Sequence, residues 1–252
     1  MSRIIPPVVL PVAPVDRVLA RVGAIWSPKV APHHLIYAST GAGKSSLIKM
    51  LAWLRPKARL LLVTPKPNPD PVYEGFARPV LDLQPGFGCD YEGGGPHGLW
   101  FEIFGQRDQH AGKNSGTARR IGQALEIVAS EGHTVLVVDD ARFVCKHLGL
   151  GDVVDRITGM SRSDATSVIL STTELAYVAG RQQGSMTWVG FTGGSLAPAK
   201  AAAGLLGLRG AANEETCAAV RRHEWIYQDH EAGNAGPCLT RPTLADVIRC
   251  TQ

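Results

Sequence analysis

The sequence predicts an α/β fold in which helices flank a mostly parallel β-sheet. Three observations support this prediction: short apolar runs alternate with stretches of helical periodicity, a glycine-rich loop follows the first of these runs, and a pair of aspartates follows a later one. Strands separated by helices need crossover connections, which make neighbouring strands parallel. A chain of 252 residues is long enough to bury a sizeable core in one domain of this class.

Apolar and helical stretches alternate along most of the chain. The runs that predict strands are HLIYA, RLLLVT at 59–64, TVLVVDD at 134–140, SVILSTTE at 167–174, MTWVGFT and EWIYQ. The predicted helices cover residues 45–54, about 115–130, about 151–161, 197–208 and 213–222. Residues 66–112 are rich in proline and glycine, and we expect a functional loop region with little regular structure there.

The N-terminal segment IIPPVVLPVAPV predicts an extended arm over residues 1–20, because proline fixes φ and removes a backbone donor. Residues 21–252 are predicted to form a single domain. No apolar stretch approaches the length of a membrane span, so we expect no membrane insertion and a cytoplasmic protein.

The composition argues against several other classes of protein. The five cysteines have neither the close-pair spacing of a zinc site nor a secretory context, which predicts free thiols in a reducing compartment. The formal net charge of +4 permits a polyanionic partner without requiring one.

The stretch HHLIYASTGAGKSSLIKML has the pattern of a phosphate-binding loop between a strand and a helix. The glycines let the backbone curl so that successive N–H groups face a phosphate, and the start of the next helix adds partial positive charge. We expect Lys44 to reach the β- and γ-phosphates of ATP and Ser45 to place its hydroxyl on Mg²⁺. Ala38 replaces the first glycine of the usual pattern, which requires a negative φ there. The predicted nucleotide-binding residues are Ser39, Thr40, Gly41, Ala42, Gly43, Lys44, Ser45 and Ser46.

Two aspartates, Asp139 and Asp140, stand at the carboxyl end of a predicted buried strand. Beside a phosphate loop, an aspartate at this place holds the water shell of Mg²⁺, and we assign this role to Asp139. Asp140 is then placed to orient or deprotonate the attacking water. The alternative interpretation is that both aspartates merely cap the following turn.

Four segments together resemble the FtsK/HerA superfamily of nucleic-acid-pumping ATPases, which includes bacterial DNA translocases and the genome-packaging ATPases of some viruses. ASTGAGKS is similar to the family's phosphate loop, and VLVVDD stands at its acidic strand. LLLVTPKPNPDPVYEGFARPVL looks like its second strand with a Pro-Lys turn and a short tyrosine-containing segment, and SRSDATSVILSTTE looks like its arginine-plus-sensor strand. The resemblance covers about residues 33–175.

This resemblance implies a P-loop NTPase domain of the ASCE or RecA-like class that binds ATP and Mg²⁺, forms a homo-oligomeric ring and translocates nucleic acid. The chain lacks the membrane segments and the C-terminal DNA-reading domain of the septal translocases, which favours viral genome packaging. The expected cargo is then double-stranded DNA, the docking partner a portal or vertex protein, and the location the host cytoplasm or the virion.

The resemblance also assigns roles to residues near the sensor strand. Thr172 stands at the sensor position, and Arg162, ten residues earlier, matches an arginine that enters the neighbouring subunit's site. The alternative for Arg162 is a solvated arginine at a helix end. The family usually has glutamate where this chain has Asp140, so Glu174 is the alternative base, because the sensor strand lies beside the phosphate-loop strand in this family.

A path for nucleic acid is predicted at cations just beyond the carboxyl ends of the strands. Lys66 and Lys146 qualify, with Arg142 behind them, and such contacts would go to phosphates. The alternative is that these are ordinary surface cations. Two rival functions also stay open at this point: a P-loop phosphotransferase, and a non-motor switch that binds nucleotide to control assembly.

Overall fold

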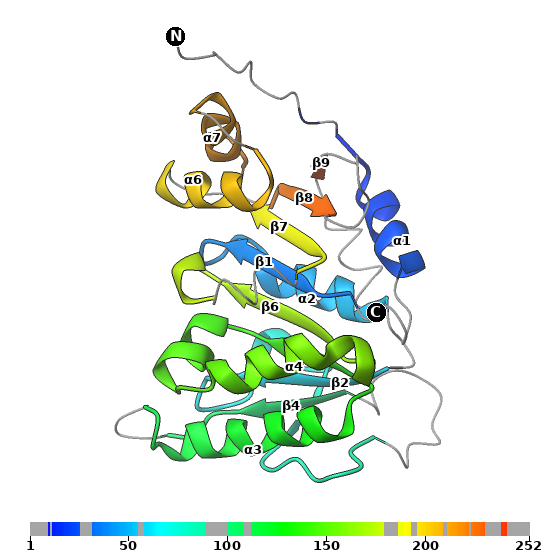
Figure 1. Cartoon of the computed structure of the whole chain (residues 1–252), viewed down its shortest axis with the longest axis vertical. Coiled ribbons are helices and arrows are strands. Elements are labelled where there is room, and N and C mark those ends of the chain that lie inside the picture. Colours follow the sequence, from blue (N-terminus) through cyan, green and yellow to red (C-terminus); the bar gives the residue numbers. More distant parts are fainter. Residues whose placement is uncertain are drawn as a thin grey trace.

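The computed structural model contains one nine-stranded sheet in the order β3-β4-β2-β5-β6-β1-β7-β8-β9 (Figure 1). The strands are β1 (His34–Ala38), β2 (Arg59–Thr64), β3 (Arg78–Val80), β4 (Trp100–Phe104), β5 (Thr134–Val138), β6 (Ser167–Thr172), β7 (Trp188–Thr192), β8 (Trp225–Asp229) and β9 (Cys238–Thr240). The structure describes residues 10, 12–25, 32–54, 58–88, 100–107, 112–178, 186–192, 196–208, 211–221, 223–229 and 238–240.

All strands from β3 to β7 in this order are parallel, whereas β8 and β9 are antiparallel. The sensor strand β6 lies between β1 and β5, with Tyr37 opposite Thr172 and Val138 opposite Leu170. The predicted mostly parallel α/β fold is therefore confirmed. This register brings the carboxyl ends of β1, β5 and β6 to one edge of the sheet, where ligands bind in open α/β folds.

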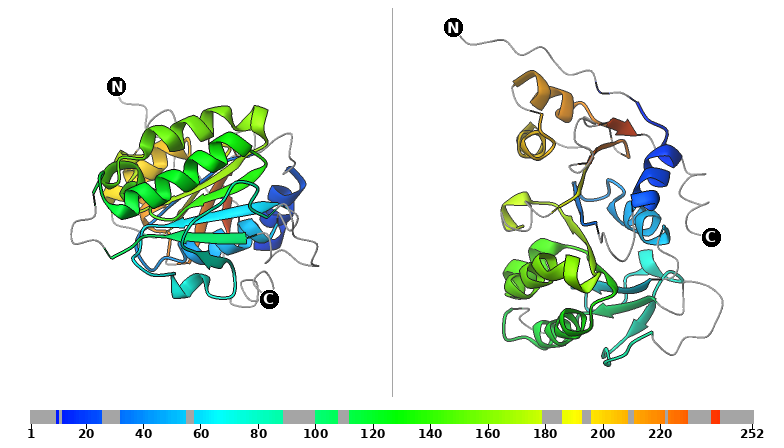
Figure 2. Two further views of the ribbon diagram at one scale, coloured as in Figure 1. Left: turned by 90° about the horizontal axis from the view of Figure 1, so that it is seen from below. Right: turned by 45° about the vertical axis from the view of Figure 1, so that its right-hand side comes forward.

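Helices cover both faces of the sheet, as the two views of Figure 2 show. The helices are α1 (Val15–Ile25), α2 (Lys44–Trp53), α3 (Gly116–Glu131), α4 (Gly151–Asp164), α6 (Leu196–Leu205) and α7 (Ala211–Ala218). Helices α1 and α2 pack on one face, and α3, α4, α6 and α7 belong to the core of the other. Alternate residues of each strand feed these two cores: Leu136 and Val138 enter one, and Val135 and Val137 the other.

Regular structure is present in the region where the sequence predicted a loop. Strands β3 and β4 and the short 3-10 helix η1 (Pro71–Tyr73) lie within the predicted loop region, so that prediction was wrong for these residues. The apolar run of β4 is short and follows a glycine-rich stretch, which concealed it.

The expected extended arm also differs from the structure, because residues 15–20 belong to helix α1. Val18 and Leu19 are buried among residues of α2, and burying this apolar stripe favours the helix. Before the helix, Ala13 donates its N–H to the Leu239 carbonyl at 2.9 Å and so joins the chain to β9. Residues 1–9 and 11 lie outside the described residues.

Within the part of the chain that the structure describes, no helix has both the length and the apolar character to cross a membrane. Three of the five cysteines, Cys145, Cys217 and Cys238, are described, and none of these three forms a disulfide. Burial raises the pKa of Cys217 to about 11, so this thiol stays protonated at neutral pH and is unreactive.

Candidate active site

The glycine-rich loop joins the buried end of β1 to the first residue of α2, which is the arrangement a phosphate loop requires. Gly41 and Gly43 adopt φ values of 74° and 93°, in the left-handed region that favours glycine. Ala38 is the last residue of the strand and has no positive φ, so its side chain is accommodated. The one departure from the usual loop pattern is therefore harmless.

Lys44 opens helix α2 and holds the loop closed. Its Nζ donates to the carbonyl oxygens of Ala38 and Ser39 at 2.9 and 3.0 Å. Burial lowers the pKa of Lys44, and the nearby charges of Asp139 and Asp140 oppose this shift. A partly desolvated ammonium at the start of a helix is well placed to bind phosphate.

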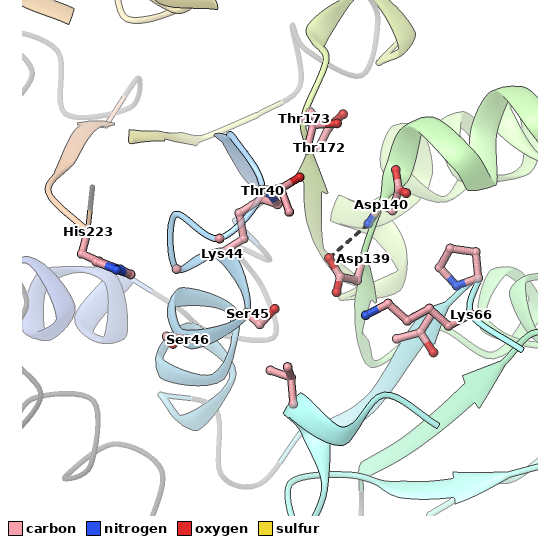
Figure 3. Close-up of a pocket in the computed structure, with 15 residues that line it drawn as sticks. Thr40, Lys44, Ser45, Ser46, Lys66, Asp139, Asp140, Thr172, Thr173 and His223 are labelled. Atoms are coloured by element: carbon pink, nitrogen blue, oxygen red, sulfur yellow. Dashed lines mark hydrogen bonds between the residues drawn. The ribbon is translucent and has the colours of Figure 1, made fainter. Parts of the chain in front are cut away.

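A cavity of about 470 Å³ opens in front of this loop (Figure 3), within the size range of small-molecule sites. Its lining includes six of the eight predicted phosphate-loop residues, the predicted sensor residue and both aspartates: Thr40, Gly41, Gly43, Lys44, Ser45, Ser46, Thr172, Asp139 and Asp140. It also includes Thr64, Pro65, Lys66, Val72, Thr173 and His223. Of the predicted set, Ser39 and Ala42 do not line the cavity; the Ser39 carbonyl accepts from the Ala42 N–H at 3.3 Å and so shapes the loop.

Asp139 is fixed by donors from three directions. Tyr73 Oη donates to its Oδ2 at 3.0 Å, the Asp140 N–H donates to its Oδ1 at 3.1 Å, and the Ser171 hydroxyl donates to the same Oδ1. Hydrogen bonds of this kind hold a carboxylate in one orientation and stabilise its charge.

Tyr73 connects this carboxylate to the phosphate loop. The ring is fully buried in η1, and the phenol lies beside the Ser45 side chain. Burial, followed by the nearby charge of Asp139, raises the pKa of Tyr73 well above 10, so the phenol remains a donor at neutral pH. The two residues predicted to hold the metal, Ser45 and Asp139, thus lie next to the same phenol.

Mg²⁺ fits the donors at this place. It is usually bound by one or two protein oxygens together with waters and substrate phosphates, and a serine hydroxyl and a carboxylate both face the cavity here. Among the described residues, no cluster of three or more histidine, cysteine, aspartate or glutamate side chains forms a separate all-protein metal site.

Asp140 differs from its neighbour in being exposed and in adopting a positive φ of 59°. Its Oδ1 accepts the Phe143 N–H at 3.3 Å, so it caps the turn that leads into the π-helical segment η3 (Phe143–His147). It also lines the cavity. Asp140 therefore caps the turn and also occupies a position suited to a base. Its positive φ is a strained backbone conformation of the kind that is common at functional sites.

Glu174, the alternative base, does not line the cavity. Its carboxylate forms an ion pair with Arg142, one of the cations predicted to contact nucleic acid. Its backbone is tied to the sensor residue: the Thr172 hydroxyl donates to the Glu174 carbonyl at 3.0 Å and accepts the Glu174 N–H at 3.1 Å. The turn after β6 therefore directs Thr172 into the site and the glutamate toward Arg142.

The remaining predicted cations lie in different places. Lys66 lines the cavity and forms an ion pair with Asp70, whereas Lys146 is exposed on η3. Residue 162 lies near the end of α4, and the Arg162 side chain is outside the described residues.

The structure brings in seven residues that the sequence did not single out for the site. Tyr73 and Ser171 donate to Asp139, and five more line the cavity: Thr64, Pro65, Val72, Thr173 and His223. A signal for Tyr73 existed in the tyrosine-containing segment, and for Ser171 and Thr173 in the polar end of the sensor strand. His223 comes from a turn near the end of the chain, and no pattern in the sequence marks it.

The chain matches no protein-family model and no curated protein sequence. Its fold is similar to that of the genome packaging NTPase B204 from Sulfolobus turreted icosahedral virus 2 in complex with AMPPCP, with a TM-score of 0.60 and 14% identity over 86% of this chain and 100% of that chain. The DNA-packaging ATPase B204 from Sulfolobus turreted icosahedral virus gives a TM-score of 0.58 and 14% identity over 84% and 99% of the two chains. VirB4 of Thermoanaerobacter pseudethanolicus gives 0.60 and 12% identity over 90% and 94%. At these identities the likeness shows the fold alone, and at that level it confirms the predicted α/β fold of the P-loop NTPase class.

Proposed function

We propose that this chain is an ATP-hydrolysing motor that forms a ring and translocates double-stranded DNA, as in the packaging of a viral genome. The observation that carries the proposal is the single cavity that unites the phosphate loop, two adjacent aspartates and the sensor residue Thr172. This is the set that hydrolysis of a nucleoside triphosphate requires: a phosphate cradle, an oxygen ligand for the metal, and a base for water.

In the proposed reaction, water attacks the γ-phosphate of ATP and ADP leaves. The N–H groups of the loop and Lys44 hold the phosphates and balance the charge that develops on them. Asp140 orients the water and accepts its proton, while Thr172 contacts the γ-phosphate. Mg²⁺, held by Ser45 and Asp139, would neutralise phosphate charge.

The proposed ring places Arg162 in the site of a neighbouring protomer. Helix α4 ends at Asp164 and β6 begins at Ser167, so residue 162 lies at the amino end of a parallel strand, whereas the cavity lies at the carboxyl ends. A six-residue strand spans roughly 17 Å, which is longer than an arginine side chain. This separation supports the proposal that the arginine acts on the nucleotide of another copy of the chain, as a transition-state cation supplied in trans.

Mixing two inactive variants tests the ring. Arg162→Ala should bind ATP nearly normally and hydrolyse it slowly, because the lost charge matters mainly in the transition state. Mixtures with Lys44→Ala contain some interfaces with both groups intact and should recover part of the activity. A mixture of Lys44→Ala with Asp139→Asn, which are defective in the same chain's site, should recover none. Wild-type hydrolysis by Arg162→Ala with DNA present would contradict the ring assignment.

The cargo is proposed from the similarity in fold to B204, a DNA-packaging ATPase. Lys146 and Arg142 remain the predicted phosphate contacts of the DNA path. A portal or vertex protein remains the expected docking partner.

The deciding experiment is the ATPase rate with no nucleic acid, double-stranded DNA, single-stranded DNA and RNA, each at two salt concentrations. A motor for double-stranded DNA should be stimulated by that polymer most, and less so at high salt. Slow hydrolysis indifferent to every polymer would favour the assembly switch, and transfer of phosphate to an acceptor other than water would favour the phosphotransferase.

A further inference from the structure

The turn after β2 forms the cavity wall that lies opposite the phosphate loop. Thr64, Pro65, Lys66 and Val72 come from this segment and line the cavity. Figure 3 shows the ammonium of Lys66 directed toward Asp139, on the opposite side of that carboxylate from Lys44. Two lysines from distant parts of the sequence thus face one cavity.

A buried anion holds Lys66 in this position. Asp70 is only 4% exposed and forms an ion pair with the Lys66 ammonium. Asp70 is itself fixed, since its N–H donates to Glu102 Oε1 at 2.9 Å and its Oδ1 accepts the Val72 N–H at 3.1 Å. Such an arrangement orients a flexible lysine before any ligand binds, which reduces the entropy cost of using it.

Lys66 is nevertheless available to a ligand. Its side chain is 57% exposed although its partner Asp70 is buried, so the contact with Asp70 occupies one side of the ammonium. An ammonium has three donors, so one contact leaves two of them for a ligand, and Lys66 lines the cavity. The same cavity is lined by Asp139, Asp140 and the loop around Lys44.

Glu102 explains why this wall keeps its shape. The Thr64 hydroxyl donates to Glu102 Oε1 at 2.8 Å, so this buried carboxylate joins the end of β2 to Asp70. Tyr73 continues the same segment and donates to Asp139. The turn therefore contacts the metal-binding aspartate through one residue and presents a cation beside it through another.

We propose that Lys66 is a second phosphate-binding lysine, which contacts the γ-phosphate of ATP from the wall opposite the phosphate loop while Asp70 keeps it in place. This rests on the proposed binding and hydrolysis of ATP, and it replaces the role in DNA binding that the sequence predicted for Lys66. Because ADP has no γ-phosphate, Lys66 distinguishes the two nucleotides and stabilises the charge of the transferring group.

The test compares Lys66→Met, which keeps the length of the side chain and removes its charge, with Lys66→Arg and with the control Lys200→Ala. Lys200 is exposed on α6 and does not line the cavity. Dissociation constants for ATPγS and ADP are measured with Mg²⁺, together with single-turnover hydrolysis of ATP. Lys66→Met should weaken ATPγS binding roughly 10- to 100-fold, as expected for a hydrogen bond between charged groups, and slow hydrolysis, with ADP binding changed little. Lys66→Arg should retain much of both properties, and Lys200→Ala should match the wild type.

Lys66→Met leaves the buried carboxylate of Asp70 without its ion-pair partner, which can destabilise the fold. The double variant Lys66→Met/Asp70→Asn therefore separates a loss of function from a loss of folding. It should be at least as stable as Lys66→Met in thermal unfolding and still fail to prefer ATPγS. An unchanged ratio of ATPγS to ADP affinity with wild-type hydrolysis would overturn the proposal, and so would a reduced salt dependence of DNA binding as the only defect. Absence of ATPγS binding by the wild type would instead refute the proposed function.

Discussion

The two ends of the cavity are built in different ways. At the end that holds the proposed metal ligand, called the metal end below, Asp139 accepts hydrogen bonds from Tyr73, Ser171 and the backbone of Asp140, which come from three separate parts of the chain. At the other end, on the far side of the phosphate loop in Figure 3, His223 stands on an exposed turn with a φ of 69°. Its ring lies close enough that a Cβ on Gly43 would come within 3.0 Å of its Nδ1.

The rigid end around Asp139 is suited to catalysis, whereas the end with His223 can adapt to a ligand. A carboxylate held by several donors keeps its geometry while phosphates and metal change around it, which is what positioning for catalysis requires. A histidine on an exposed turn with few partners can move as a ligand enters. We therefore expect substitutions at the metal end to affect turnover, and substitutions at the His223 end to affect binding alone.

Lys44→Ala should have the largest effect, because Lys44 serves both ends by holding the loop closed. We expect hydrolysis below detection and nucleotide affinity lowered roughly 10- to 100-fold, with the fold intact since an ammonium contributes little to the core. The measurements are steady-state ATPase activity, nucleotide titration and circular dichroism. Turnover at the wild-type rate would refute the assignment of the phosphate loop.

Asp140→Asn should rank second and should separate two roles within the metal end. Loss of a general base lowers turnover about 10²- to 10⁴-fold, and we expect Mg²⁺–ATP still to bind. Asp139→Asn should lose turnover and also weaken the dependence of binding on Mg²⁺, because it removes a metal ligand. Single-turnover hydrolysis and nucleotide titration with and without Mg²⁺ distinguish them. An active Asp140→Asn beside an inactive Glu174→Gln would transfer the role of base to Glu174.

Tyr73→Phe should have an intermediate effect. It removes one donor to Asp139 and keeps the buried ring. Loss of such an outer-shell hydrogen bond lowers metal affinity about 10-fold or more, and the free energy of unfolding should fall by about 0.5–1.5 kcal/mol. Magnesium titrations of ATPase activity and chemical denaturation measure these two quantities. Unchanged magnesium dependence would show that Ser171 and the backbone suffice to fix Asp139.

The sequence predicts those parts of the site that are encoded by short runs of neighbouring residues. The phosphate loop is encoded within a few residues whose spacing is dictated by backbone geometry, so the residues and their strand–loop–helix context were predicted together. Asp139 and Thr172 follow apolar runs that could only be buried strands, and parallel pairing brings such strand ends to one edge.

The contacts that the sequence did not predict depend on distant pairings or side-chain directions. Tyr73 meets Asp139 only because η1 folds back beside β5, 66 positions away in sequence. Lys66 and Glu174 both follow strands, yet the first turns into the cavity and the second turns toward Arg142. The direction of each side chain is set by the geometry of its turn, which the amino-acid composition does not predict. His223 was the most difficult residue to predict, because its turn is positioned by strand β8, which pairs with β7 in the antiparallel part of the sheet.

His223→Ala should have the smallest effect and tests the binding end directly. The ring lines the cavity beside Gly43 of the phosphate loop, and we expect the nucleoside of a bound nucleotide to extend toward it. If it packs against the base, affinities for ATP and ADP should fall together by about 2- to 10-fold, the range for one aromatic contact, with the rate of single-turnover hydrolysis unchanged. His223→Gly is the matched control, because it removes the same ring and relieves the positive φ, so it should bind as weakly as His223→Ala and be about 1 kcal/mol more stable. A slower chemical step in both variants would mean that the two ends are coupled, and the division between a catalytic end and a binding end would be wrong.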